Sequence, residues 1–238
     1  MAHPQNSESS RSSQFDAYDH SYNEAVNRAL AFTGMKVDFF TRVKMDYLID
    51  IIQCLLPGAD AANVLDVGCG IGNGHPLIVD RVRHLTGVDV SQSCIDRARD
   101  KNPSVEYDNF DGVSLPYDDR SFDVVFAVSV FHHVPLAERL ALGREIWRVL
   151  RTAGLFVIFE HNPRNPLTTR VVNNCEFDRD AILLDSPTCE SLMASAGFRD
   201  VKTRFILTLP AKGRMLRALD RIFAGLPIGA QYYTIGRA

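Results

Sequence analysis

The chain has 238 residues, enough for one large α/β domain but short for two. Its hydrophobic fraction of 46% and charged fraction of 23% are typical of a globular protein. The formal net charge of -3 gives no electrostatic support for binding DNA or RNA, so we expect no nucleic-acid partner.

The cysteines and the hydropathy of the chain indicate the cellular environment in which the protein works. The five cysteines include no C-x-x-C pair, and their spacing suits neither zinc nor a disulfide framework. We therefore expect no metal site and a reducing environment. We recognise no signal peptide and no apolar run long enough to span a bilayer, so a cytoplasmic location is predicted.

The N-terminal quarter is predicted to be a tail followed by helices. Residues 1–14 are polar and serine-rich and are predicted to be disordered. Apolar residues recur at helical spacing over 15–32 and again over Val37–Leu55. Pro57-Gly58 ends the second of these predicted helices.

From residue 63 the pattern alternates between strands and helices. One predicted helix runs through Val79, a second is capped by Ser91, and a third covers 137–151. The predicted strands are 63–67, 84–90, 104–107, 122–130 and 155–160. Such βαβ alternation predicts a parallel sheet with helices on both faces.

The last third departs from this alternation. A connection containing Pro163 and Pro166 leads to a helix from Ser186 through Ala196, which Gly197 stops. Two further strands are predicted at 201–209 and 231–236, separated by an inserted segment at 210–230.

Residues 64–74 carry the most informative motif, Val-Leu-Asp-Val-Gly-Cys-Gly-Ile-Gly-Asn-Gly. A buried strand followed by a glycine turn lets backbone N–H groups approach a ligand at the start of a helix. Asp89 follows Gly72 by 17 residues, near the spacing at which an acid reaches ribose hydroxyls. Asn73 stands where the dinucleotide fingerprint needs its third glycine, which disfavours a pyrophosphate-binding loop.

Four segments in this order resemble the class I S-adenosylmethionine-dependent methyltransferases: 65–72, 87–91, Asp111-Gly112 and 122–125. The resemblance extends from about residue 64 to the C-terminus. It implies a doubly wound, Rossmann-like α/β fold with a mostly parallel seven-stranded sheet and an antiparallel C-terminal edge pair. It also implies S-adenosyl-L-methionine as cofactor and S-adenosyl-L-homocysteine as product.

The expected organisation is a single methyltransferase domain over 15–238. Within it, the helical segment 15–58 corresponds to the cap that such enzymes keep over the cofactor. Segments 161–185 and 210–230 are expected to be insertions on the substrate side.

The resemblance also assigns cofactor contacts, because ligands of open α/β sheets bind beyond the carboxyl ends of the strands. Asp66 and the loop 68–72 face the methionine part, Asp89 the ribose, and Asp111 the adenine amino group. The complete predicted set is Asp66, Gly68, Cys69, Gly70, Gly72, Asp89, Val90, Asp111, Gly112 and Val128. Two alternatives stay open: Asp89 as an acid serving a helix N-terminus, and Asp108 in place of Asp111.

Two histidines are candidates for a catalytic base. Methylation of a hydroxyl or ammonium group requires a proton acceptor, and histidine titrates in the appropriate range. His133 follows the fourth predicted strand and His161 follows the fifth, so both belong at the rim of the cofactor site. Alternatively, the run 160–162 (Glu-His-Asn) binds a polar substrate through hydrogen bonds.

The inserted segment is predicted to contain an amphipathic helix over 211–226. Its apolar stripe includes Met215, Leu219 and Ile222, and its basic face consists of Lys212, Arg214, Arg217 and Arg221. We expect this helix to cover the active site with its arginines in solvent. The alternative is contact with an anionic membrane, or with a lipid-linked or phosphorylated acceptor.

The sequence thus predicts methyl transfer to a small-molecule acceptor, with oxygen as the expected atom. A sugar, a natural product and a lipid-linked intermediate are the candidate acceptors. Residues 129–133 (Ser-Val-Phe-His-His) lack the Asn/Asp-Pro-Pro-Tyr/Phe run expected for adenine N6 methylation. The rival functions are a nicotinamide-dependent oxidoreductase and a non-catalytic binding module with the same fold.

Overall fold

The structure is a computed structural model that describes residues 22–31, 34–56, 58–175, 178, 181–209 and 214–238. The predicted disordered tail and the first part of the predicted helix 15–32 lie outside these residues. No helix of the described chain combines the length and apolarity needed to cross a membrane.

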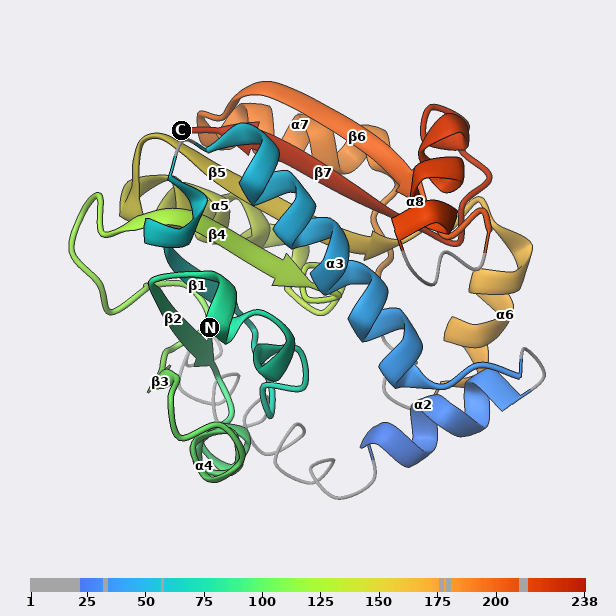
Figure 1. Ribbon diagram of the computed structural model, residues 1–238, viewed down its shortest axis with the longest axis horizontal. Coiled ribbons are helices and arrows are strands. Elements are labelled where there is room, and N and C mark those ends of the chain that lie inside the picture. Colours follow the sequence, from blue (N-terminus) through green and yellow to red (C-terminus); the bar gives the residue numbers. More distant parts are fainter. Residues whose placement is uncertain (1–21, 32–33, 57, 176–177, 179–180, 210–213) are drawn as a thin grey trace, which may run out of the picture.

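A sheet of seven strands organises the described chain (Figure 1). Its spatial order is β3-β2-β1-β4-β5-β7-β6, and β1 to β5 run parallel. Only β7 is antiparallel to its neighbours, β5 and β6. The strands are β1 Asn63–Val67, β2 His84–Asp89, β3 Glu106–Asn109, β4 Phe122–Val128, β5 Leu150–His161, β6 Arg199–Ile206 and β7 Gln231–Arg237. The predicted doubly wound fold, with its antiparallel C-terminal pair, is confirmed.

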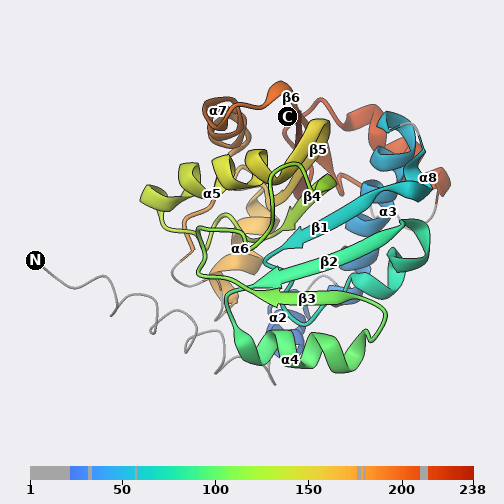
Figure 2. The same ribbon diagram turned by 90° about the vertical axis from the view of Figure 1, so that its left-hand side faces the viewer.

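Helices cover both faces of this sheet. Figure 2 shows α5 and α7 on one side and α3 and α8 on the other. The α-helices are α2 Tyr22–Leu30, α3 Val37–Leu55, α4 Gln92–Lys101, α5 Leu136–Val149, α6 Pro166–Asn174, α7 Ser186–Ala196 and α8 Arg214–Asp220. Ser91 caps α4 by accepting from Cys94 N, and Gly197 ends α7 with φ 110°, as the sequence predicts.

The sheet separates two hydrophobic cores. Along β5, Leu155, Val157 and Phe159 are buried on the side of α3. Phe156 and Ile158 are buried with residues of α5 and α7 on the other side. Side chains of a strand alternate between faces, so a strand buried on both faces is continuously apolar. This is why the central strands could be recognised from short apolar runs.

The prediction of a helix that runs through Val79 is wrong. Two short 3-10 turns, His75–Leu77 and Val79–Arg81, occupy this position. Pro76 lacks a backbone N–H, and the buried His75 ring is held by hydrogen bonds to other elements. These local constraints replace a regular helix after β1.

Several strand limits also differ from the prediction. β4 ends at Val128 rather than at residue 130, because Ser129 turns into the left-handed region with φ 58°. β3 covers Glu106–Asn109 rather than 104–107, since Val105 N bonds to Asn102 O in a turn. β6 covers Arg199–Ile206 rather than 201–209, because Leu207 has φ 61°.

Helix α6 was not predicted. Asn165 caps it, with a side-chain oxygen that accepts from Leu167 N and Thr168 N, and Pro166 is its first residue. The proline-rich run therefore begins a helix rather than a loop.

The insertion also differs from the expected helix 211–226. α8 spans Arg214–Asp220 and continues as a 3-10 turn over Arg221–Phe223, while residues 211–213 lie outside the described residues. Arg217 is buried, and its Nη1 lies 2.6 Å from Asp46 Oδ2 of α3. The expectation that the arginines lie in solvent is wrong for Arg217, because acids of α3 pair with it.

Candidate functional site

A cavity of about 290 Å³ opens between α3 and the carboxyl ends of β1, β2 and β4. Gly72, Asp111 and His161 do not line it, whereas His133 does. Eight of the ten predicted cofactor residues line it: Asp66, Gly68, Cys69, Gly70, Asp89, Val90, Gly112 and Val128. The strand ends thus bring most of the predicted contacts together, as expected for an open α/β sheet.

Asp89 organises the glycine loop from the end of β2. Its Oδ2 accepts from Gly70 N at 2.8 Å and its Oδ1 accepts from Ser91 N at 2.9 Å. Burial raises the pKa of this carboxyl group, while the two backbone donors favour the ionised form. Each carboxylate oxygen has more than one lone pair, so both retain capacity to accept a ligand hydroxyl.

Gly70 presents bare backbone to the cavity. Its φ is 51°, and a Cβ atom built there meets no atom of the described chain within 4 Å. Gly70 lines the cavity, and its positive φ makes any other residue strained at this position.

Asp66 offers a second polar group at the end of β1. Its Oδ2 lies 3.0 Å from His75 Nε2, and His75 Nδ1 lies 2.6 Å from Tyr107 Oη. Its Oδ1 is buried and has no hydrogen-bond partner among the residues that the structure describes. An orphaned carboxylate oxygen at a cavity wall fits a cationic group such as the ammonium of a methionine moiety.

The two predicted cofactor residues outside the cavity have local structural roles. Gly72 has φ 66°, and a Cβ there would lie 2.5 Å from Tyr107 Oη. Asp111 is exposed, and its Oδ1 accepts from Val113 N and Ser114 N at 2.8 and 2.6 Å. The adenine role of Asp111 stays a prediction.

A charged cavity residue, Lys44, was missed by sequence reasoning. Lys44 of α3 is buried, and its Nζ donates to Ser129 Oγ at 3.3 Å. Burial lowers the pKa of Lys44 to about 8, although Glu160 and Asp178 oppose the shift. The sequence feature that could have indicated this residue is its position: Lys44 follows Val43 directly, inside the apolar stripe of the predicted helix.

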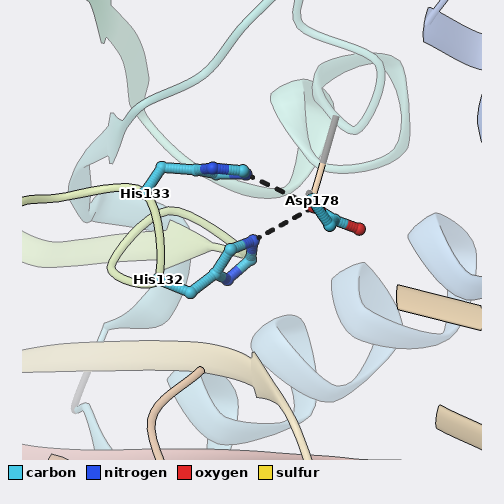
Figure 3. A group of neighbouring side chains, drawn as sticks. All are labelled: His132, His133 and Asp178. Carbon is cyan, nitrogen blue, oxygen red and sulfur yellow. Dashed lines mark ion pairs between the residues drawn. The ribbon is translucent and has the colours of Figure 1, made fainter. Parts of the chain in front are cut away.

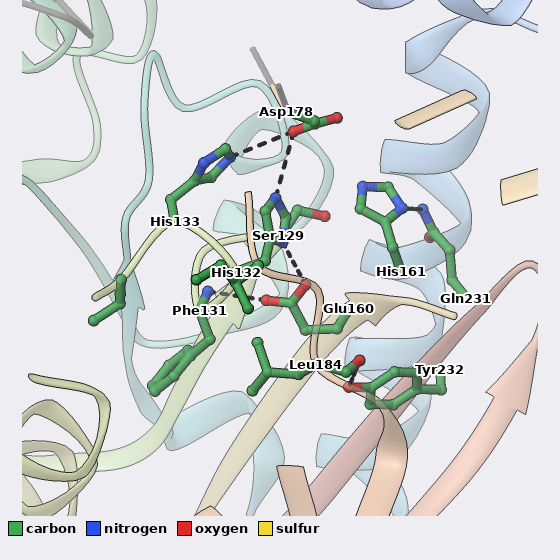
Figure 4. Close-up of polar contacts among 12 residues, drawn as sticks. Ser129, Phe131, His132, His133, Glu160, His161, Asp178, Leu184, Gln231 and Tyr232 are labelled. Atoms are coloured by element: carbon green, nitrogen blue, oxygen red, sulfur yellow. Dashed lines mark hydrogen bonds and ion pairs between the residues drawn. The ribbon is translucent and has the colours of Figure 1, made fainter. Parts of the chain in front are cut away.

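A chain of acids and histidines lies beside the cavity (Figure 4). His132 Nδ1 lies 2.6 Å from Glu160 Oε2, and Glu160 Oε1 accepts from Phe131 N at 2.9 Å. His132 Nε2 and His133 Nε2 each lie 3.5 Å from Asp178 Oδ1. Burial disfavours the charged form of His132, but the two carboxylates outweigh it and raise its pKa to about 9.

His161 occupies a different environment from His133. Its Nδ1 lies 3.5 Å from Gln231 Nε2 of β7 (Figure 4). Burial, assisted by His132 and Lys44, lowers the pKa of His161 to about 4. Of the two predicted bases, His133 is therefore the one that reaches the cavity.

A doubly wound sheet, with a glycine loop and an acid at the ends of its first two strands, defines a Rossmann-like protein that binds a nucleoside group. Residues 65–158 match the family model described as a methyltransferase domain. A Mycolicibacterium smegmatis protein with the name "probable S-adenosylmethionine-dependent methyltransferase" is 33% identical over 191 residues, covering 76% of this chain and 67% of its own. The chain belongs to the class I S-adenosylmethionine-dependent methyltransferases.

Two further relatives and one solved structure are also similar to this chain. A relative of the same description from Mycobacterium tuberculosis is 32% identical over 76% of this chain, which spans 63% of that relative's length. The 27-O-demethylrifamycin SV methyltransferase of Amycolatopsis mediterranei is 35% identical over 45% of this chain and 41% of its own. A methyltransferase structure from Thermotoga maritima shares the fold, with a TM-score of 0.65, 19% identity and coverage of 94% of this chain and 97% of its own.

Proposed function

We propose that this protein transfers the methyl group of S-adenosylmethionine to an oxygen atom of a small-molecule acceptor. The cavity carries the proposal, because Asp66, Gly70 and Asp89 suit a cationic nucleoside at one end. Lys44 and His133 offer proton acceptors elsewhere on its wall. The cofactor supplies the reactivity of the methyl group, and the protein holds the acceptor oxygen in line with it.

His133 is the histidine that we expect to act on the acceptor. It lines the cavity, whereas His161 does not. An apolar or aromatic acceptor suits the remaining wall, which includes Phe40 and Phe110. The Amycolatopsis relative is named for methylation at an oxygen, which supports oxygen as the acceptor atom.

The first test is a calorimetric titration of the full chain with S-adenosylhomocysteine, with NADH run in parallel. Binding of S-adenosylhomocysteine alone is expected. Ligand at about a hundred times its dissociation constant also raises the free energy of unfolding by about 2.7 kcal/mol. Binding of NADH alone would support the oxidoreductase alternative.

Turnover is tested with isotopically labelled S-adenosylmethionine and a panel of phenols, sugars and isoprenoid quinols. Labelled product from a hydroxylated compound is expected. Replacing His133 with Gln is expected to lower kcat, whereas the matched variant His161→Gln retains it. Cofactor binding without turnover on any acceptor, cell extract included, would favour the non-catalytic module.

We also propose that the insertion makes a peripheral contact with lipid. Arg217 and Asp220 of α8 are buried, whereas several apolar side chains of the insertion are exposed: Met215, Leu219, Ile222, Phe223 and Leu226. An exposed apolar patch of this kind marks an interaction surface. Co-sedimentation with phosphatidylglycerol vesicles is expected, and Ile222→Ser should weaken it. Leu136→Ser on α5 is the matched control, and equal loss in both variants would contradict the contact.

A further inference from the structure

Three potential metal ligands converge beside the cavity (Figure 3). His132 Nε2 and His133 Nε2 each lie 3.5 Å from Asp178 Oδ1, and the three ligand atoms lie within 4.8 Å of one another. Ligands of a tetrahedral ion with bonds of about 2.1 Å lie about 3.4 Å apart. The two histidine–carboxylate distances already match this spacing.

The orientation of His132 supplies an independent argument. Its ring is 2% exposed, and Nδ1 lies 2.6 Å from the Glu160 carboxylate. When His132 acts as a metal ligand, its ring is neutral: Nδ1 donates to Glu160, and Nε2 offers its lone pair on the side of Asp178. Nε2 has no hydrogen-bond partner within the described part of the chain. A cation must lie between Nε2 and the Asp178 carboxylate: it is either a proton on Nε2 or a metal ion that replaces this proton. The separation of 3.5 Å is long for a strong hydrogen bond and leaves room for the exchange.

Glu160 also contacts the ring nitrogen of His132 that would not bind the ion, as carboxylates commonly do beside metal-bound histidines. A carboxylate that accepts from the second ring nitrogen sets the tautomer and raises the basicity of the ligating nitrogen. Glu160 is held in turn by Phe131 N at 2.9 Å. The hydrogen-bonded carboxylate–histidine pair is therefore already formed without an ion.

We propose that His132, His133 and Asp178 bind a divalent transition-metal ion, with Glu160 as the positioning residue. Two histidines and one carboxylate suit zinc or ferrous iron and leave coordination positions open. His133 lines the cavity, so an ion bound here would lie beside the space in which we propose that the acceptor binds. This role rests on the proposed function: the ion would hold the acceptor oxygen and lower its pKa, and His133 would act as a ligand rather than as a base.

Chain spacing alone does not predict this site. His132 and His133 follow β4, whereas Asp178 lies between α6 and α7. Only the fold brings the three side chains together, which is why the sequence indicated no metal.

Metal binding is tested on the full chain without any methyl donor, after treatment with a chelator. Calorimetry with Zn²⁺ is expected to show one ion per chain, and Mg²⁺ is expected not to compete. Co²⁺ is expected to give d–d absorption without a thiolate charge-transfer band, which excludes the five free cysteines as ligands. Absence of Zn²⁺ binding at millimolar concentration, or a thiolate band, would overturn the proposal.

Ligand variants locate the site. His133→Gln and Asp178→Asn change side chains at the edge of the cluster and are expected to weaken Zn²⁺ binding at least about tenfold. Glu160→Gln is expected to weaken it about tenfold through His132, with an altered Co²⁺ spectrum. His84→Gln, at an exposed position, is the matched control. Melting curves verify folding, and equal affinity in all variants would overturn the site. Because no donor is present, a failure of methyl transfer would not affect this measurement.

Discussion

Single residues at the cavity have structural roles and also leave polar groups or open space toward it. Asp89 fixes the glycine loop through Gly70 N and keeps acceptor capacity toward a ribose. Gly70 lines the cavity, and a Cβ there would meet no atom of the described chain within 4 Å. Ser129 adopts φ 58°, and its hydroxyl accepts from Lys44. Backbone strain of this kind gathers at ligand sites, where the surrounding structure maintains it.

Asp89→Ala and Gly70→Val should both weaken S-adenosylhomocysteine binding. The first removes the carboxylate acceptors, and the second places a branched side chain in the cavity. We expect a loss of about tenfold or more in each, measured by calorimetry. Asp80→Ala, an exposed acid that does not line the cavity, is the control. Unchanged affinity in either cavity variant would count against the site.

Lys44→Met should stabilise the fold at neutral pH. The folded chain releases the Lys44 proton near a pKa of about 8, whereas the unfolded chain keeps it up to 10.5. The buried charge therefore costs up to about 3 kcal/mol below pH 8, and this cost disappears as pH rises. Urea unfolding from about pH 7 to about pH 10 should show the two proteins converging. Lys202→Met on exposed β6 should show no such trend. A pH-independent difference would refute the assignment.

At the scale of elements, the insertion is held by its polar residues rather than by its apolar stripe. Arg217 of α8 pairs with Asp46 and Asp50 of α3. The buried Asp220 carboxylate accepts from Tyr47 Oη and from three successive backbone N–H groups, at residues 207, 208 and 209. α8 is thus tied to α3, whose other residues line the cavity, and to the end of β6.

Asp220→Ala should destabilise the protein strongly. Removing the carboxylate leaves buried N–H groups without an acceptor, which we expect to cost about 4 kcal/mol. The melting temperature should fall by roughly 10 °C for a chain of this length. Asp80→Ala, at an exposed position, provides the comparison in the same assay. Equal melting temperatures for the two variants would show that Asp220 does not anchor the insertion.

For the whole molecule, the site lies where separate segments meet at one edge of the sheet. Loops after β1, β2, β3 and β4 contribute, and α3 closes the cavity from the N-terminal side. The central strands β1, β4 and β5 lie between two cores and form the rigid base. Ligand binding therefore acts on loops that project from a well-packed sheet.

Hydrogen exchange should map this arrangement. Adding S-adenosylhomocysteine is expected to slow exchange at 66–74, 89–91, 110–113 and 128–134 and in the first half of α3. Exchange in β6 and α7 should stay unchanged, because they lie away from the cavity. The central strands should be the slowest with or without ligand, since their amides open only with the global fold. Protection spread evenly over the chain would contradict a local site.

The sequence by itself determined the sheet and predicted eight of the residues that line the cavity. Continuous apolar runs predicted the buried strands, and the motif 65–72 with Asp89 predicted a nucleoside-binding edge, because these signals are local in the chain. The tertiary structure alone decided the rest. Lys44 reaches the cavity from a helix that precedes the sheet, and Asp178 meets His132 and His133 only through the fold. Arg217 is buried because acids on α3 face it. Such contacts join segments far apart in the chain, so no local periodicity or spacing predicts them.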